Sequence, residues 1–231
     1  MQLAAQQARF AGMKAAHADP HVAEVAVILE QHGPSNLFLF LRASLKTQSS
    51  DLLVTTLGRR LALPGPEAVR LMAIVQGWRN TLDSQALTCR LGAIVEQLVA
   101  RLLRQTRFAP QDVHEETGVL LTSGDKSAPF DVLAAGAPPW EAYECKAGHE
   151  IPWKQGKELS FVARTANAKG DQLRVVIASP ADRESLRRAI TAEVSACDLI
   201  YFVAEDDLFS IATAPPSEHA CPEERSAGPA R

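Results

Sequence analysis

The chain has 231 residues, of which 46% are hydrophobic and 22% are charged, and its formal net charge is −3. These proportions are close to those of globular proteins and exclude a disordered or low-complexity chain. The length accommodates one domain of ordinary size together with a smaller unit. The small negative charge gives no overall attraction to a polyanion, so any contact with nucleic acid must come from local basic residues and metal ions.

The chain has four cysteines, which stand far apart and form no C-x-x-C pair; they are Cys89, Cys145, Cys197 and Cys221. This spacing indicates neither a disulfide framework nor a zinc site, and it fits a reducing compartment. The first 20 residues contain no apolar signal segment, and no later stretch reaches the roughly 18 uninterrupted apolar residues of a membrane span. We therefore expect a soluble, cytoplasmic protein that makes no contact with a membrane.

Residues 1–82 predict a mostly helical unit that serves recognition or the docking of a protein partner. Residues 1–20 suggest a helix or a loose arm, and residues 21–31 form an apolar run that fits either a strand or a helix. In residues 67–82 the apolar positions recur at helical spacing; they are Val69, Met72, Ile74, Val75 and Trp78. A helix pair around residues 58–60 would present arginines as a DNA-binding helix-turn-helix does, but a packing or docking role is the favoured interpretation.

The next predicted helix begins at Ser84 with Asp83 or Ser84 as its N-cap, and its apolar stripe contains Leu91, Val95, Leu98 and Leu102. Glu96 lies off that stripe, on a ridge with Gly92. A lone Glu on an amphipathic helix is usually exposed to solvent, so only its relation to the downstream strands makes Glu96 a candidate site residue.

Residues 130–148 carry the strongest chemical pattern of the chain. Two runs that read as strands are separated by a turn with Gly136, Pro138 and Pro139, so they predict a hairpin that places Asp131 beside Glu144. Glu144 and Lys146 project from one face of their strand because side chains alternate in an extended chain. The neighbouring positions are small or apolar, which indicates a buried strand where charges need partners or a metal ion.

These residues carry a resemblance to a known family. Asp131, Glu144 and Lys146, preceded by the helix motif Gly92-x-x-x-Glu96, resemble the PD-(D/E)XK nuclease superfamily. The similarity covers residues 84–210, with the difference that Phe130 separates Pro129 from Asp131. It implies an α/β fold with a mixed central sheet flanked by helices, the restriction-endonuclease-like core, in residues 83–213.

The resemblance also implies the chemistry. Asp131 and Glu144 would bind Mg²⁺, with Mn²⁺ as a possible substitute, because hard cations prefer carboxylate oxygens. Glu96 would hold a metal-bound water or a second ion. Lys146 would orient the attacking water or stabilise the developing negative charge, and nearby carboxylates favour its charged form. Cys145 faces the opposite side of the strand and is a weaker candidate for a nucleophile.

The following segment predicts a helix whose core residues are Leu159, Phe161 and Val162. Some branches of the superfamily carry a Gln on this helix, which Gln155 matches. The segment from Lys154 through Arg174, both ends included, contains five basic and two acidic residues, so Lys154, Gln155 and Lys157 are the candidate nucleic-acid contacts. A strand, a helix and another strand then predict a crossover unit, and the Pro-rich residues 214–231 predict a disordered tail.

The sequence thus predicts a metal-dependent nuclease that cuts DNA, with a defence or restriction endonuclease as the first choice and a homodimer as a possible state. Two alternatives stay open. One is a nuclease that acts on RNA or single strands, and the other is a non-catalytic nucleic-acid-binding or assembly module that retains the fold.

Overall fold

A computed structural model describes residues 1–46 and 63–221 of the protein. Its centre is one six-stranded mixed sheet in the order β1-β2-β3-β4-β5-β6. Neighbouring strands from β1 to β4 are antiparallel, and β4, β5 and β6 are parallel. The strands are β1 (Gln2–Gln6), β2 (Val113–Leu120), β3 (Phe130–Ala134), β4 (Trp140–Cys145), β5 (Leu173–Ser179) and β6 (Ile200–Ala204).

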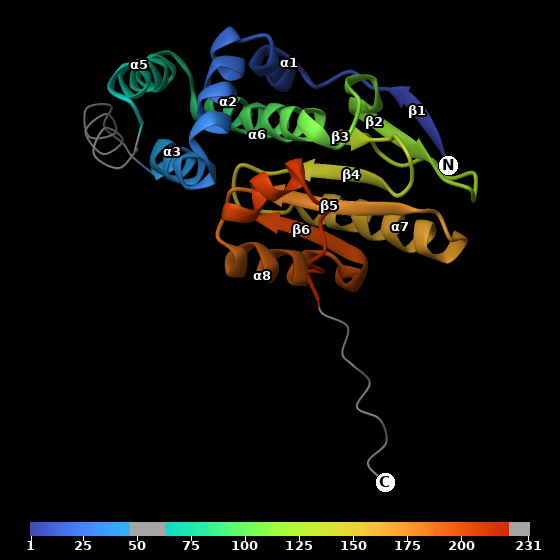
Figure 1. The fold of residues 1–231 in the computed structure, drawn as a ribbon. Helices are drawn as coiled ribbons and strands as arrows, with labels where there is room; N and C mark the ends of the chain where they lie inside the picture. Colours follow the sequence, from blue (N-terminus) through green and yellow to red (C-terminus); the bar gives the residue numbers. More distant parts are fainter. Residues whose placement is uncertain (47–62, 222–231) are drawn as a thin grey trace.

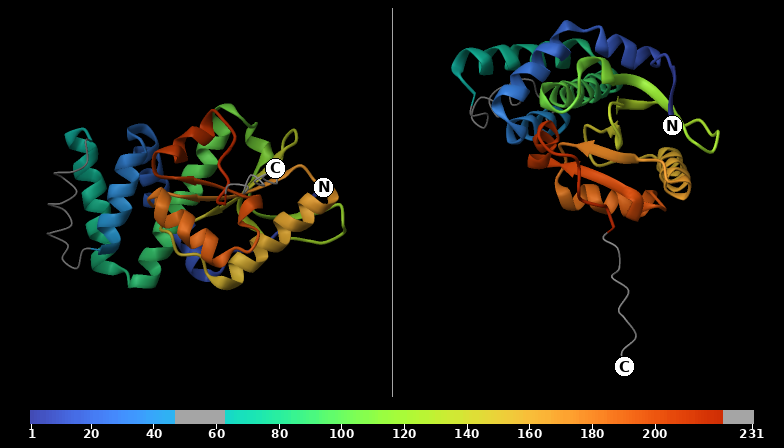
Figure 2. Two further views of the ribbon diagram at one scale, coloured as in Figure 1. Left: turned by 90° about the horizontal axis from the view of Figure 1, so that it is seen from below. Right: turned by 45° about the vertical axis from the view of Figure 1, so that its right-hand side comes forward.

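Helices cover both faces of this sheet (Figure 1). The N-terminal helices and α6 lie on one side, and α7 and α8 lie on the other, as the turned views in Figure 2 also show. The α-helices are α1 (Ala11–His17), α2 (Pro20–His32), α3 (Pro34–Lys46), α5 (Gly65–Thr81), α6 (Ser84–Thr106), α7 (Trp153–Lys169) and α8 (Arg183–Glu193). Short 3-10 helices are η1 (Pro110–Asp112), η2 (Cys197–Leu199) and η3 (Glu205–Ala212). None of the helices in residues 1–46 and 63–221 combines the length with the hydropathy that a membrane span requires.

The predicted α/β class with a mixed sheet flanked by helices is confirmed. Alternation along the central strands divides the buried side chains between two cores. Tyr143 of β4 and Val176 of β5 pack on the α6 side with the N-terminal helices, whereas Ala142 and Ile177 pack on the side of α7 and α8. The sheet is therefore the middle of three layers, which buries both faces of its parallel strands.

The N-terminal region departs from its prediction in two places, and one open alternative is decided there. Residues 2–6 are neither a helix nor a loose arm, because they form strand β1 at the edge of the sheet, where Leu3 pairs with Val119. The ambiguous run after residue 20 is a helix, α2, whose N-cap Asp19 accepts a hydrogen bond from the backbone of His21. In α5, Val69 is 62% exposed and Leu71 is buried in its place.

The helices of residues 1–82 share one buried apolar cluster with α6 and with the sheet; among its members are Val25, Phe40, Leu71, Leu98 and Tyr143. Packing is thus continuous from the N-terminal helices to β4. The basic segment around residues 58–60 lies outside the described residues.

The strands that carry the site pattern are arranged as predicted. β3 and β4 form an antiparallel hairpin in which Val132 pairs with Tyr143 and Leu133 with Ala142. β5, α8 and β6 form the predicted crossover, since β5 and β6 are parallel neighbours. In α7, Leu159 and Val162 are buried, but Phe161 is 50% exposed and is not the core residue that the sequence suggested.

Two expectations for the C-terminal region are wrong within the described residues. Residues 214–221 are ordered against the edge of β6, where the backbone of Ala220 donates a hydrogen bond to the carbonyl of Ile200. In addition, Cys197 and Cys221 form a disulfide. The spacing of the cysteines did not predict this pair, because the two residues are 24 positions apart and only the return of the chain along β6 brings them together. Residues 222–231 lie outside the described part of the chain.

Substitution of Gly156 by Ala is expected to destabilise the fold. A Cβ atom there would lie 2.3 Å from the carbonyl oxygen of Glu193, so α7 would have to move away from the end of α8. Overpacking of this kind costs about 1–3 kcal/mol. The matched control is Gly77→Ala in α5, where a Cβ meets nothing within 4 Å and Ala should add up to about 1 kcal/mol as a better helix former. Urea unfolding of both variants measures the difference; equal free energies of unfolding would contradict this packing.

Candidate metal centre

Three carboxylates from different elements meet at one point. Glu96 of α6, Glu116 of β2 and Asp131 of β3 each place a carboxylate oxygen within 4.8 Å of the other two. Glu144 of β4 lines the same cavity as all three. Two predicted site residues, Glu96 and Asp131, are therefore brought together in this cluster, with Glu144 beside them.

Glu96 is held in the interior by the helix that carries it. Asp83 is the N-cap of α6 and accepts a hydrogen bond of 2.7 Å from the backbone of Ala86. The helix then runs between the N-terminal helices and the sheet, so that it is buried on several sides and Glu96 is only 4% exposed. The solvent-exposed position that is usual for a lone Glu is thus excluded, and the carboxylate requires polar partners.

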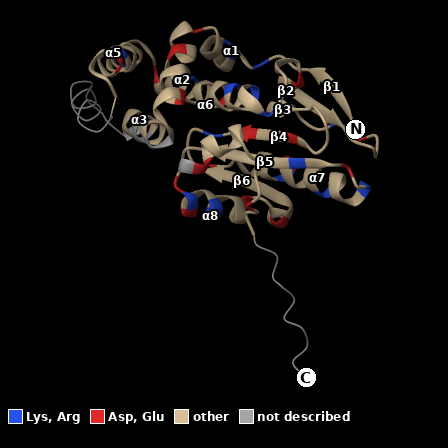
Figure 3. Cartoon of the chain, in the orientation of Figure 1, with Lys and Arg blue, Asp and Glu red and all other residues tan. Residues whose placement is uncertain are grey.

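The hairpin fixes the other acidic residues. With Val132 opposite Tyr143, the next residues of the antiparallel register are Asp131 and Glu144. Asp131 Oδ2 accepts a hydrogen bond of 2.7 Å from the backbone N–H of Cys145. Glu144 Oε1 accepts one of 2.9 Å from Lys146 Nζ and another from the side-chain amide of Gln155. Figure 3 shows the acidic residues of β4 in the middle of the sheet.

Glu116 was not identified from the sequence. It stands in β2 between Glu115, which pairs with Val132, and Thr117, which pairs with Phe130, and so it faces Asp131 across the ladder. Its backbone has a φ of 51°, in the left-handed region that residues other than glycine seldom adopt. Such strain is concentrated at functional sites. The sequence feature that could have pointed to Glu116 is the pair Glu115-Glu116 in the strand next to the one that carries Asp131.

Arg9 and His17 of the N-terminal segment also reach the cluster, and no pattern along the chain predicted either contact. His17 Nε2 lies 2.8 Å from Glu96 Oε2. The Arg9 guanidinium lies 3.2 Å from Glu116 and 3.6 Å from Glu96, and it makes a contact of 2.9 Å with Glu115. Arg9, far away in the sequence, therefore balances part of the negative charge, and His17 adds a close polar contact to Glu96.

The negative charge that these contacts leave uncompensated raises the pKa of two carboxyl groups in the cluster. Burial raises the pKa of Asp131 well above its ordinary value, and the charges of Glu144 and Glu96 raise it further. Burial and the charge of Glu96 likewise raise the pKa of Glu116. Burial opposes the charged form of Lys146, but the carboxylates of Glu144 and Asp131 outweigh it and hold the pKa of Lys146 above its ordinary value. Lys146 is therefore a fixed cation rather than a free base.

Cys145 has the environment of a core residue. Its side chain belongs to the buried apolar cluster on the α6 side of the sheet, and burial raises the pKa of its thiol well above the ordinary value. A thiol of this kind carries little thiolate, which is the reactive form. A nucleophilic role for Cys145 has no support here.

The predicted nucleic-acid contacts lie at the start of α7 in different environments. Gln155 is turned inward and is hydrogen-bonded to Glu144. Lys154 and Lys157 are exposed, and Lys157 Nζ lies 3.6 Å from the centre of the Trp153 ring, which is itself 63% exposed. The two lysines therefore present positive charge to solvent within one turn of the residue that supports Glu144.

The donor set of the cluster fits a hard divalent cation. Glu96, Glu116 and Asp131 offer oxygen atoms alone, from elements that the packed core holds in place. Mg²⁺ and Mn²⁺ prefer such ligands and need few of them, because they retain several waters. The raised pKa of Asp131 and of Glu116 indicates that further positive charge would stabilise the cluster.

No family model, curated protein or solved structure matches this chain. The interpretation of the site consequently depends on its geometry and on the residues that form it.

Replacing Asp131 by Asn is expected to stabilise the metal-free protein. Because the pKa of Asp131 is raised in the fold, stability falls as the pH rises from about 4, the ordinary Asp value, through the raised pKa. The Asn amide oxygen can still accept the Cys145 N–H without a charge. In EDTA the Tm of Asp131→Asn should therefore exceed that of the wild type by roughly 2–4 °C at neutral pH, the shift for about 1 kcal/mol in a chain of this size. The excess should shrink on acidification.

The control for this experiment is Asp125→Asn, which makes the same chemical change in an exposed turn. Its Tm should follow the wild type at each pH. A lower Tm for Asp131→Asn than for Asp125→Asn at neutral pH would show that the Asp131 charge is well compensated without a cation.

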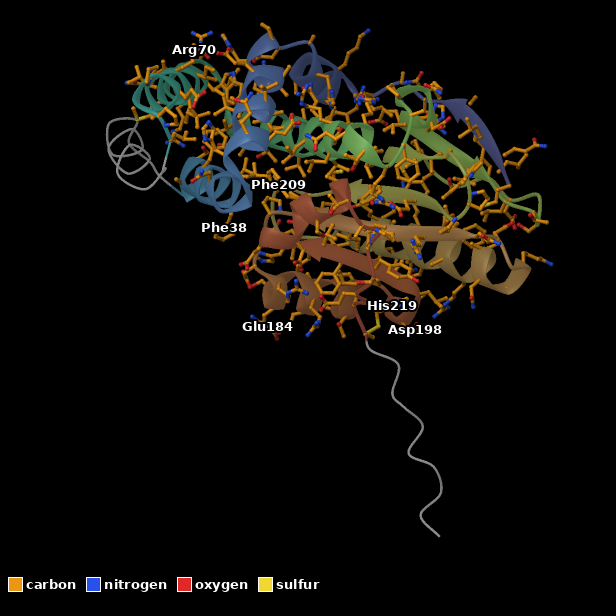
Figure 4. The ribbon with its side chains drawn as sticks, viewed as in Figure 1. Phe38, Arg70, Glu184, Asp198, Phe209 and His219 are labelled. Atoms are coloured by element: carbon orange, nitrogen blue, oxygen red, sulfur yellow. A yellow bond between two sulfur atoms is a disulfide. The ribbon has the colours of Figure 1, made fainter. Side chains whose placement is uncertain are left out.

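Divalent cations are expected to raise the Tm through Glu116. A ligand at about 100 times its Kd stabilises the fold by about 2.7 kcal/mol. Thermal melts with MgCl₂ or MnCl₂ should show this gain in the wild type and in Glu184→Gln, an exposed residue on α8 labelled in Figure 4. Glu116→Gln should lose most of it. An equal gain in all three proteins would place cation binding elsewhere.

Proposed function

We propose that this protein is a Mg²⁺- or Mn²⁺-dependent nuclease that hydrolyses phosphodiester bonds of DNA. The observation that carries the proposal is the convergence of Asp131, Glu144 and Lys146 with the buried carboxylate of Glu96 and the partly buried carboxylate of Glu116 in one cavity. The order of these residues along a helix and an antiparallel hairpin supports the resemblance to the PD-(D/E)XK superfamily.

Each element of the proposed reaction has a residue suited to it. Hydrolysis of a phosphodiester requires a nucleophilic water and compensation for the charge that grows on the phosphoryl oxygens. The carboxylates of Glu96, Glu116 and Asp131 would hold the cation, which lowers the pKa of bound water and neutralises phosphoryl oxygens when it is present. Glu144, held by Gln155, would complete the ligand set.

Lys146 supplies the second positive charge. Its Nζ lies 2.9 Å from Glu144 Oε1 and its side chain is 19% exposed, so the ammonium is oriented but still accessible from the cavity. Because the neighbouring carboxylates keep it protonated, we assign it to the stabilisation of the negatively charged transition state. Preorganised donors of this kind commonly contribute about 10²–10³ in rate.

Cleavage assays test the proposal. Labelled DNA, in duplex and single-stranded form, is incubated with the protein in Mg²⁺, in Mn²⁺ and in EDTA. We expect cleavage with either metal and none in EDTA. Lys146→Met should reduce kcat about 10²–10³-fold, whereas Lys126→Met, the same change in the exposed turn beside Asp125, should retain it.

Binding of DNA without cleavage by the wild type in either metal would favour the non-catalytic module. Cleavage of RNA alone would overturn the assignment of DNA as the substrate. Full activity of Lys146→Met would remove Lys146 from the mechanism.

A further inference from the structure

The acidic cluster lies within a cleft that continues beyond it. The cavity that holds Glu96, Glu116, Asp131 and Glu144 has a volume of about 460 Å³. A second cavity of about 670 Å³ adjoins it, and both are lined by Thr88, Lys146 and Ala147. The second cavity extends to Phe38 of α3 and to the start of α8. Figure 4 shows Phe38 on the side of α3 that faces α8.

Access to the cluster is restricted by the N-terminal segment. Ala8, Arg9, Phe10 and Met13 line the first cavity together with residues of β4 and with Gln155 of α7. The Glu96 side chain is only 5% exposed, and that of Arg9 is 16% exposed. A phosphate must therefore enter the cleft to reach the cluster. The phosphates of a duplex lie on the outside of a wide cylinder, whereas an unpaired strand is narrow and flexible enough to be drawn into such a cleft.

An aromatic side chain stands at the wall of this cleft. Phe10 lines the first cavity and is 61% exposed, which is unusual for a phenylalanine. Gly12 allows the ring to lie close to the backbone, because a Cβ atom there would be 3.1 Å from Phe10 Cε2. Proteins that bind unpaired nucleic acid stack its bases on exposed aromatic rings that lie near cationic groups. Arg9 and Lys146, which line the same cavity, are such cationic groups.

We propose that the cleft accepts an unpaired segment of the DNA, such as a single strand or a frayed or flap end, and that Phe10 stacks on a base next to the phosphate that is cut. The adjoining cavity up to Phe38 then receives the strand on the other side of that phosphate. This inference rests on the proposed nuclease function and specifies its substrate.

Two measurements test it. Cleavage of a single-stranded DNA oligomer, a duplex with a single-stranded flap and a closed circular duplex is compared in Mg²⁺. In addition, fluorescence anisotropy measures binding of the labelled single strand to each protein in EDTA. The wild type should cut the single strand and the flap at least tenfold faster than the closed duplex. Phe10→Ala and Phe10→Leu should weaken binding and raise KM about tenfold, the size expected for the loss of one stacked base.

Phe10→Trp should restore binding, because it keeps an aromatic face. The matched control is Phe161→Ala, which removes a similarly exposed ring from α7 and should leave binding and cleavage unchanged. Metal-dependent cleavage that is as fast on the closed duplex, or equal binding by wild type, Phe10→Leu and Phe10→Trp, would overturn this inference and leave the nuclease function standing. Absence of cleavage on every substrate would instead overturn the proposed function.

Discussion

The fold must accommodate several negative charges close together in its interior. Four carboxylates, from Glu96, Glu116, Asp131 and Glu144, line one cavity. Charges removed from water are costly unless they are paired or bind a metal ion. Several features of the chain reduce this cost: the Cys145 N–H on Asp131, the ammonium and amide donors on Glu144, and the basic side chains from the N-terminus. The compensation is incomplete, as the raised pKa of Asp131 shows, and the proposed divalent cation would complete it.

The N-terminal region supplies polar and cationic partners for these carboxylates. Strand β1 ties the chain to the edge of the sheet, and the segment that follows carries Arg9 to Glu116 and His17 to Glu96. The backbone of Gln7 also donates a hydrogen bond to the carbonyl of Glu116. The same segment lines the cavity that contains the carboxylates, so it contributes both to the charge balance and to the lining of the candidate site.

The hairpin of β3 and β4 was predictable because its cues are local. Alternation placed Glu144 and Lys146 on one face, and the Gly and Pro residues of the turn reversed the chain, which brought Asp131 beside Glu144. Glu116 was not predicted as a site residue, because its position beside Asp131 depends on the register between β2 and β3 and on a left-handed backbone conformation. Neither property has a period or a motif that can be found along the chain.

The sequence by itself determined the α/β class, the crossover of β5 and β6, and the acidic hairpin, because hydrophobic periodicity and turn residues act over a few positions. Tertiary structure alone decided the burial of Glu96 and the contacts that Arg9 and His17 make with it. It also decided the pairing of Cys197 with Cys221. Each of these arises between residues that are distant in sequence. Such contacts follow from how helices and strands pack together, and packing is a property of the whole fold rather than of any segment.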